Sequence, residues 1–298
     1  MNGSFVKQNL QSNVRSLDMK FIFFGTPYVA RDTLATLCAH GYRPEAVVTN
    51  PDAPSGRGQL LTPSPTNVFA TEQNIPVHTP DVLDNAFLER VNAYGAEAAI
   101  VVAYGKIFPQ SLIESFPLGA INVHYSLLPK YRGAAPVEHA LRNGETETGV
   151  TIQLMVLQMD AGDVLAQERI AIDPMDTTST LRPKLITAGA ELLVSLMPQI
   201  AEGTLVPIPQ NHDEATYAPK LRKEDAELTL TPEYHHTNWN KYRAFKEWSG
   251  VYFFTERNGT RIRVKVTEAT LTDDGVFLIQ RVIPEGKKEM DYETFLQQ

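Results

Sequence analysis

The side chains best suited to handling protons and charge are Asn122, His124 and Asp160. Asn122 and His124 lie in an apolar run, residues 119–124, that predicts a strand, and side chains two apart in a strand project from the same face. Asp160 lies in a short acidic loop between two further predicted strands. We expect the three side chains to meet at one rim of a parallel sheet, where open α/β sheets bind their ligands.

These residue types suit direct acyl transfer to an amine. An imidazole beside a carboxylate can act as a general acid or base, and an amide can stabilise the oxyanion of a tetrahedral intermediate. Cys38 is the only cysteine and Ser126 lacks a nucleophile elbow, so a covalent enzyme intermediate is not predicted. A histidine at a strand end is often purely structural, and spacing alone leaves that alternative open.

The order of predicted elements indicates an α/β fold. Up to about residue 204, apolar runs typical of buried strands alternate with helical patterns, which predicts a doubly wound, mostly parallel sheet. Gly25 alone occupies the first strand-to-helix turn, so the three-glycine dinucleotide fingerprint is absent. The expected strands are residues 20–24, 46–49, 98–103, 119–124, 149–157 and 164–171, and the longest expected helix is 178–201.

A change of composition predicts a second, smaller domain. Residues 205–238 are rich in Pro, Thr and charged side chains without sustained periodicity, as expected of a linker. Residues 239–298 predict a short helix and then strands, and residues 1–18 are interpreted as an extension or tail. The expected organisation is therefore a tail, a catalytic domain at 19–204, a linker and a β-rich domain.

Charge is spread unevenly along the chain. The net charge is −8, yet residues 237–298 hold 10 Lys and Arg against 9 Asp and Glu. There Arg261, Arg263 and Lys265 share one face of a predicted strand. That face is suited to a phosphate backbone, and a solvated face offset by glutamates is an equally good interpretation.

A second candidate for phosphate contact lies in a long loop, residues 50–65, rich in Pro, Gly and Ser. Structureless loops of this length usually bind something. Arg57 stands between Gly56 and Gly58, so its guanidinium can approach a phosphate closely. A solvated surface arginine is the simpler alternative.

Compartment is predicted from cysteine usage and apolar runs. One cysteine is compatible with a reducing cytosol and excludes a disulfide framework or a cysteine-rich zinc site. No uninterrupted apolar run approaches the roughly 18 residues that span a bilayer, so no membrane association is predicted. We expect a cytoplasmic protein, or an organellar one if residues 1–18 are a transit peptide.

Longer motifs around these residues resemble one family. Residues 122–129 (NVHYSLLP), 132–136 (RGAAP) and 159–163 (MDAGD) are similar to the folate-dependent formyltransferases. Residues 51–58 (PDAPSGRG) resemble the branch that formylates methionyl-tRNA, and the resemblance runs from Lys20 to the C-terminus.

The resemblance implies transfer of a formyl group from 10-formyltetrahydrofolate, the co-substrate, to the methionine amino group of initiator methionyl-tRNA. It implies that the β-rich domain is OB-like, and a monomer is expected. By motif position it implies catalytic Asn122, His124 and Asp160, folate-binding Ser126, Leu127, Leu128 and Pro129, and tRNA-binding Arg57, Arg261, Arg263 and Lys265.

Three departures from the family pattern affect particular expectations. Gln59 and Leu60 stand where lysines are usual, Tyr125 is expected to place a bulky ring beside His124, and the β-rich domain is short around residues 272–275. Two alternatives stay open: a formyltransferase acting on a nucleotide-linked amino sugar, and a folate- or RNA-binding protein without turnover, its site blocked by Tyr125.

Overall fold

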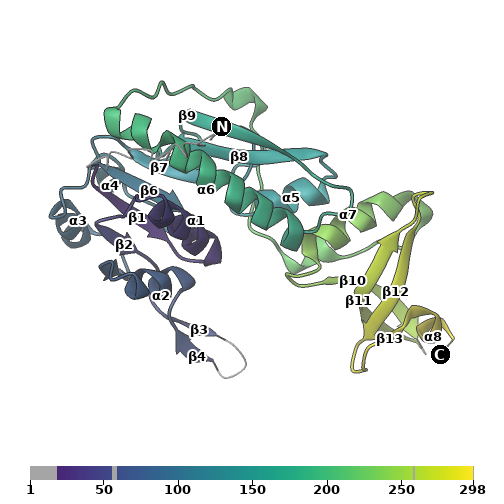
Figure 1. The fold of residues 1–298 in the computed structure, drawn as a ribbon. Coiled ribbons are helices and arrows are strands. Elements are labelled where there is room, and N and C mark those ends of the chain that lie inside the picture. Colours follow the sequence, from purple (N-terminus) through teal and green to yellow (C-terminus); the bar gives the residue numbers. More distant parts are fainter. Residues whose placement is uncertain (1–18, 56–58, 258, 298) are drawn as a thin grey trace, which may run out of the picture.

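A seven-stranded sheet forms the centre of the larger part of the molecule (Figure 1). The computed structural model describes residues 19–55, 59–257 and 259–297. The order is β5-β2-β1-β6-β7-β8-β9; the strands from β5 to β7 are parallel, and β8 is antiparallel to both of its neighbours. The predicted mostly parallel sheet is confirmed. Its strands are β1 (Phe21–Gly25), β2 (Ala46–Val48), β5 (Val77–His78), β6 (Ala98–Val102), β7 (Ala120–His124), β8 (Glu147–Leu154) and β9 (Val164–Ala171).

Helices cover both faces of this sheet. Phe21 and Phe23 of β1 share one core cluster with side chains of α1 and α6, whereas Ile22 and Phe24 share a second cluster with α3 and α4. The uninterrupted apolar run of β1 follows from this burial on both faces. The helices of this part are α1 (Tyr28–Ala39), α2 (Pro65–Glu72), α3 (Asn85–Asn92), α4 (Gln110–Ile113), α5 (Pro136–Arg142) and α6 (Thr178–Glu202).

Helix α6 has 25 residues and ends at Gly203, whose φ of 61° is the left-handed conformation that glycine adopts readily. By length and hydropathy alone it is the one helix of the described ranges that could cross a membrane. Its buried side chains, Leu185 and Leu193 among them, belong to the same core cluster as the sheet. This helix is therefore part of the core.

A four-stranded antiparallel sheet, in the order β10-β11-β12-β13, forms the smaller part. Helix α7 (His235–Phe245) joins it to the N-terminal end of α6: the Thr178 hydroxyl donates to the Ala244 carbonyl at 2.9 Å, and Arg243 Nη1 donates to the Asp176 carbonyl at 3.2 Å. The other elements of this part are β10 (Val251–Arg257), β11 (Thr260–Leu271), β12 (Phe277–Pro284), β13 (Met290–Asp291) and α8 (Tyr292–Leu296).

The long loop expected at residues 50–65 is only partly a loop. Strands β3 (Ala53–Ser55) and β4 (Leu60–Thr62) pair as an antiparallel hairpin, so the expectation of a structureless segment is wrong there. The hairpin projects from the larger part on the side to which the smaller sheet also extends (Figure 1). Arg57 and residues 1–18 lie outside the described residues.

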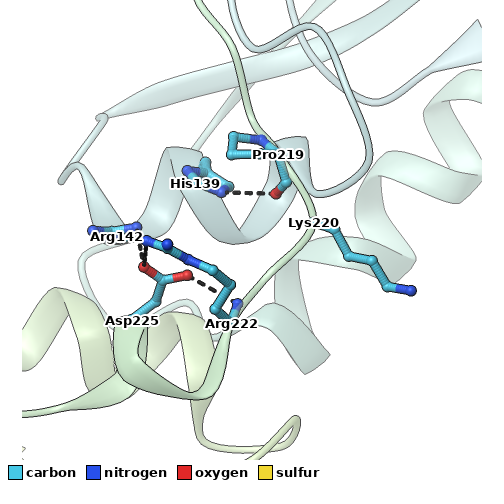
Figure 2. Close-up of a pocket in the computed structure, with 6 residues that line it drawn as sticks. All are labelled: His139, Arg142, Pro219, Lys220, Arg222 and Asp225. Carbon is cyan, nitrogen blue, oxygen red and sulfur yellow. Dashed lines mark hydrogen bonds and ion pairs between the residues drawn. The ribbon is translucent and has the colours of Figure 1, made fainter.

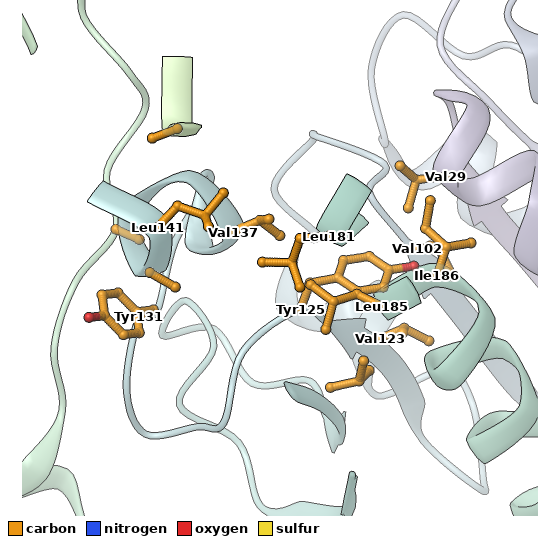
Figure 3. Close-up of a cluster of buried hydrophobic side chains, with 14 of the residues drawn as sticks. Val29, Val102, Val123, Tyr125, Tyr131, Val137, Leu141, Leu181, Leu185 and Ile186 are labelled. Atoms are coloured by element: carbon orange, nitrogen blue, oxygen red, sulfur yellow. The ribbon is translucent and has the colours of Figure 1, made fainter. Parts of the chain in front are cut away.

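The ring of Tyr125 lies in the hydrophobic core. It is 9% exposed and packs among apolar side chains that include Val29, Leu181, Leu185 and Ile186 (Figure 3). Burial raises the pKa of its hydroxyl above the ordinary value. The expectation of a bulky ring beside His124 is wrong, because the strand alternation that faces His124 toward the site turns its neighbour into the core.

Candidate active site

Strand β7 carries Asn122 and His124 on one face, the face turned toward α3 and α4. Ala120, two residues before Asn122, belongs to the core cluster on that side, whereas Ile121 and Val123 belong to the cluster with α1 and α6. His124 is 6% exposed. Asn122 is half-buried, and its side-chain amide is hydrogen-bonded to none of the residues that the structure describes. Its donor is thus available to a ligand.

The imidazole of His124 faces an acceptor with each nitrogen. Nε2 lies 2.9 Å from the carbonyl oxygen of Tyr131, and since a carbonyl can only accept, Nε2 carries a proton. Nδ1 lies 3.7 Å from Oδ2 of Asp160. A proton on Nδ1 would therefore point toward the carboxylate, and the tautomer of the neutral ring is set by the backbone.

The carboxylate of Asp160 is oriented by two donors. The backbone N–H of Gly133 donates to Oδ2 at 2.7 Å, and Gln153 Nε2 donates to Oδ1 at 3.1 Å. Gly133 has φ of 120°, and a Cβ there would lie 2.6 Å from the Ala218 carbonyl oxygen, so the residue must be glycine for its amide to reach Asp160.

The meeting of His124 and Asp160 was predicted, but the reason given for it was wrong. Asp160 does not follow a strand end at the same rim, because β8 is antiparallel to β7: His124 pairs with Thr151, and Leu154 pairs with Ile121 near the start of β7. The segment 155–163 runs back from that end and returns Asp160 to His124. The antiparallel register supplies this geometry, which motif spacing could not reveal.

Sequence reasoning missed the glutamines around Asp160. Gln153 pairs with Asn122 across β7 and β8, so it shares the face of Asn122, a fact that requires the strand register. Gln210 comes from the segment interpreted only as a linker, and it is 7% exposed. This segment pairs with the larger part, through Ile208 with Val164 and Tyr217 with Arg132. No pattern in the sequence marks Gln210.

The segment Ser126–Pro129, expected to bind folate, is held by internal hydrogen bonds. The Ser126 hydroxyl donates to the Lys130 carbonyl at 2.6 Å, and Thr151 Oγ1 donates to the Ser126 carbonyl at 2.6 Å. Gln167 Nε2 donates to the carbonyl of Leu128 at 2.8 Å. The Ser126 side chain therefore serves the shape of the segment, while Leu127 and Pro129 are partly exposed.

A pocket of about 380 Å³ lies between α5 and the connecting segment, residues 205–238 (Figure 2). None of its lining residues belongs to the triad of Asn122, His124 and Asp160. Arg142 and Arg222 approach the Asp225 carboxylate at 3.4 and 3.5 Å. Burial lowers the pKa of His139 on its wall, more than the hydrogen bond to the Pro219 carbonyl raises it. Its lining residues are His139, Arg142, Pro219, Lys220, Arg222 and Asp225.

The cations predicted to share a strand face lie on β11. The guanidinium of Arg261 stacks 3.9 Å from the ring centre of Phe254, and that of Arg263 stacks 3.9 Å from the ring centre of Tyr252, both rings belonging to β10. Lys265 is exposed on the same face. The face is thus a mixed surface of cations and aromatic rings, distant in sequence from the triad.

Comparison with known proteins assigns the chain to a family. The family model described as "Formyl transferase" matches residues 19–197. The chain belongs to the formyl transferase family. A methionyl-tRNA formyltransferase of Listeria monocytogenes is 40% identical over 93% of this chain and 95% of its own.

Solved structures of other family members share the fold. The N-formyltransferase of Helicobacter canadensis, solved with folinic acid and dTDP-3-aminofucose, aligns with TM-score 0.64 and 21% identity over 86% of this chain and 88% of that chain. A methionyl-tRNA formyltransferase of Clostridium thermocellum aligns with TM-score 0.58 and 14% identity over 92% and 99%. In this formyl transferase, His124 and Asp160 lie within the residues that the family model matches.

Proposed function

We propose that this protein transfers a formyl group from 10-formyltetrahydrofolate to the amino group of methionine on initiator methionyl-tRNA. The observation that carries the proposal is the His124 ring between the Tyr131 carbonyl and the Asp160 carboxylate, on the same strand face as the unpartnered amide of Asn122. Relatives at about 40% identity over 93% of the chain carry the name of that activity.

In this reaction the methionine nitrogen attacks the formyl carbon, and the new C–N bond forms as the carbonyl oxygen becomes an oxyanion. Asn122 and protonated His124 donate to that oxygen. The ring donates through Nδ1–H, because Nε2–H is bonded to the Tyr131 carbonyl and Nδ1, at 3.7 Å from Asp160, is not within hydrogen-bond distance of the carboxylate. Asp160 orients His124 and accepts the proton that the attacking amine releases. The bond from the formyl carbon to N10 of the folate then breaks, and N10 leaves with a proton. The products are tetrahydrofolate and formylated methionyl-tRNA.

We assign folate binding to the segment Ser126–Pro129. It follows β7 directly, so a folate bound there would present its formyl group close to His124. Its internal hydrogen bonds support the proposal, because a segment held in one shape loses little conformational entropy on binding. Leu127 and Pro129 would supply apolar contact.

We assign tRNA binding to one cationic strand face and to one further arginine. One is the face of β11 with Arg261, Arg263 and Lys265, where guanidinium groups and rings are suited to phosphates and bases. The further arginine is Arg57, which lies outside the described residues and follows β3 and precedes β4 in the sequence. The hairpin and the smaller sheet project to the same side of the molecule, which supports one tRNA contacting both (Figure 1).

The alternative acceptor, a nucleotide-linked amino sugar, is favoured only by solved structures of sugar formyltransferases that are no more than 21% identical to this chain. The Helicobacter canadensis structure was solved with such a sugar, but at 21% identity it shares only the fold with this chain. The other alternative, a folate- or RNA-binding protein without turnover, loses its basis, because the ring of Tyr125 is buried in the core rather than placed in the site.

We further propose that the protein is a cytoplasmic monomer.

Comparison of acceptors tests the proposed function. Purified protein is incubated with 10-formyltetrahydrofolate and either initiator methionyl-tRNA or dTDP-3-aminofucose, and formylated product is quantified. We expect product only with the tRNA. Product only with the sugar would overturn the proposed acceptor, and product with neither would overturn the activity.

A further inference from the structure

Gln210 occupies the centre of a buried hydrogen-bond network behind Asp160. Its Nε2 lies 2.9 Å from the Asp160 carbonyl oxygen, 2.6 Å from that of Gly162 and 3.3 Å from Oε1 of Gln153. Its Oε1 lies 3.2 and 2.6 Å from Nε and Nη2 of Arg132. One side chain of the connecting segment therefore ties the loop of Asp160 to the loop that follows β7.

Arg132 and the backbone carbonyls of Asp160 and Gly162 together fix the direction of the bonds in this network. A guanidinium can only donate, so the atom of Gln210 that faces it must be the oxygen. The amide nitrogen of Gln210 then faces the three acceptors. Gln153 must present its oxygen to Gln210, which leaves its nitrogen to donate to Oδ1 of Asp160.

The burial of Arg132 is costly and needs an explanation. Its side chain is the largest fully buried one among the described residues, at 1% exposure, and its side-chain partners are Gln210 and His212 rather than a carboxylate. A buried charge without a countercharge is unfavourable unless hydrogen bonds compensate it. Because a guanidinium cannot accept a hydrogen bond, Arg132 favours the same orientation of the Gln210 amide that the carbonyls of Asp160 and Gly162 require.

We propose that Arg132 and Gln210 are positioning residues, which set the orientation of the Gln153 amide and thereby hold the Asp160 carboxylate toward His124. The inference rests on the proposed function, in which Asp160 orients His124. Neither residue touches the reacting atoms. Their effect is to keep Oδ1 of Asp160 occupied by a donor while Oδ2 remains 3.7 Å from Nδ1 of His124.

The substitution Gln210→Glu tests the direction of the network at nearly constant shape. The new carboxylate still accepts from Arg132, which favours folding, but it can no longer donate to the carbonyls of Asp160 and Gly162. Gln153 is expected to turn its nitrogen toward Glu and its oxygen toward Asp160. Misplacement of this kind should lower kcat by about tenfold to a hundredfold while KM for methionyl-tRNA changes less than twofold.

Three comparisons complete the experiment. Gln199→Glu, on the exposed side of α6, is the matched control and should leave kcat unchanged. Arg132→Lys, still a donor only, should retain more activity than Arg132→Met, and this pair decides the matter if the Gln210 variant does not fold. The titration of the His124 ring, followed by NMR of labelled histidine, should move in Gln210→Glu and stay in Gln199→Glu.

The two proposals fail in distinguishable ways. If the wild type formylates methionyl-tRNA and Gln210→Glu has an unchanged kcat and an unchanged His124 titration, the positioning role is overturned and the proposed function stands. Equal loss in Arg132→Lys and Arg132→Met would also overturn the directional role. If the wild type does not formylate, the proposed function falls, and the NMR comparison still decides whether Gln210 sets the surroundings of His124.

Discussion

The orientation of each side chain in this site, and the donors it has free, depend on its hydrogen-bond partners. Nε2 of His124 is hydrogen-bonded to the Tyr131 carbonyl and Nδ1 lies 3.7 Å from the Asp160 carboxylate, while Asn122 is left unpartnered among the described residues. An imidazole in fixed orientation next to a free amide can stabilise an oxyanion at the moment it forms, because the donors need no rearrangement.

Removing either proton-handling group should abolish most of the rate. His124→Ala and Asp160→Ala are each expected to lower kcat with methionyl-tRNA by about 10²-fold or more, the contribution usual for a positioned general acid or base. His40→Ala, on the exposed end of α1, is the control and should behave as the wild type. Unchanged rates in both site variants, measured at saturating substrate, would remove the mechanism.

Tyr125 should matter for stability and not for turnover. Its ring fills the core beside Leu185, so Tyr125→Ala is expected to lower the free energy of unfolding by about 3 to 5 kcal/mol, as other large-to-small core changes do. Tyr125→Phe keeps the ring and should retain kcat within about twofold, since the hydroxyl lies on the core side. A large loss of kcat in Tyr125→Phe with intact folding would contradict this placement.

Among the elements, the start of α6 joins the two parts of the molecule. Asp176 precedes the helix, accepts both contacts of Lys184 Nζ at 2.8 Å and offers its carbonyl to Arg243 of α7. Burial alone would raise the pKa of the Asp176 carboxyl, but the Lys184 ammonium and the Thr180 hydroxyl outweigh burial, so the pKa lies below its ordinary value. The charged form is thus favoured by folding.

The pH dependence of stability follows from that lowered pKa. A carboxyl with a depressed folded-state pKa contributes stability above its ordinary pKa of 3.8, and the contribution is lost as pH falls through the folded-state value. Asp176→Asn should cost about 2 kcal/mol of unfolding free energy at pH 7 and less at pH 3, measured with denaturant. Asp213→Asn, an exposed control, should cost nothing at either pH.

Across the whole molecule, the acidic chain binds an anionic polymer only if its cations are gathered locally. The net charge is −8, whereas the face of β11 presents Arg261, Arg263 and Lys265 together. A tRNA that lies on this face while its end reaches His124 must contact both parts of the molecule. The hydrogen bonds of α7 with α6 connect the two parts, as a tRNA bound to both would require.

Salt dependence measures this contact. Replacing the three cations of β11 with glutamine removes their charge while keeping a polar side chain, and should reduce the slope of log affinity for tRNA against log salt by roughly two to three. Folate affinity should not change. Arg169→Gln, exposed on β9, is the control. An unaltered slope in the triple variant would exclude the β11 face from tRNA binding.

Local pattern was sufficient to predict most strands of the sheet and to single out His124 and Asp160, which the structure brings together. Apolar runs predicted β1, β6 and β7, since burial on both faces of a strand leaves a local signal. Motif residues around His124 and Asp160 were recognisable because the chemistry restricts their types.

Tertiary structure alone decided how those residues meet. Antiparallel pairing of β8 sends the chain to the far end of β7 before Asp160 returns, and a glutamine from the connecting segment, Gln210, completes the surroundings of Asp160. Strand alternation placed Tyr125 in the core rather than in the site. Register and long-range hydrogen bonds join residues far apart in the chain, such as Arg132 and Gln210, which are 78 positions apart, and no local pattern encodes such a pairing.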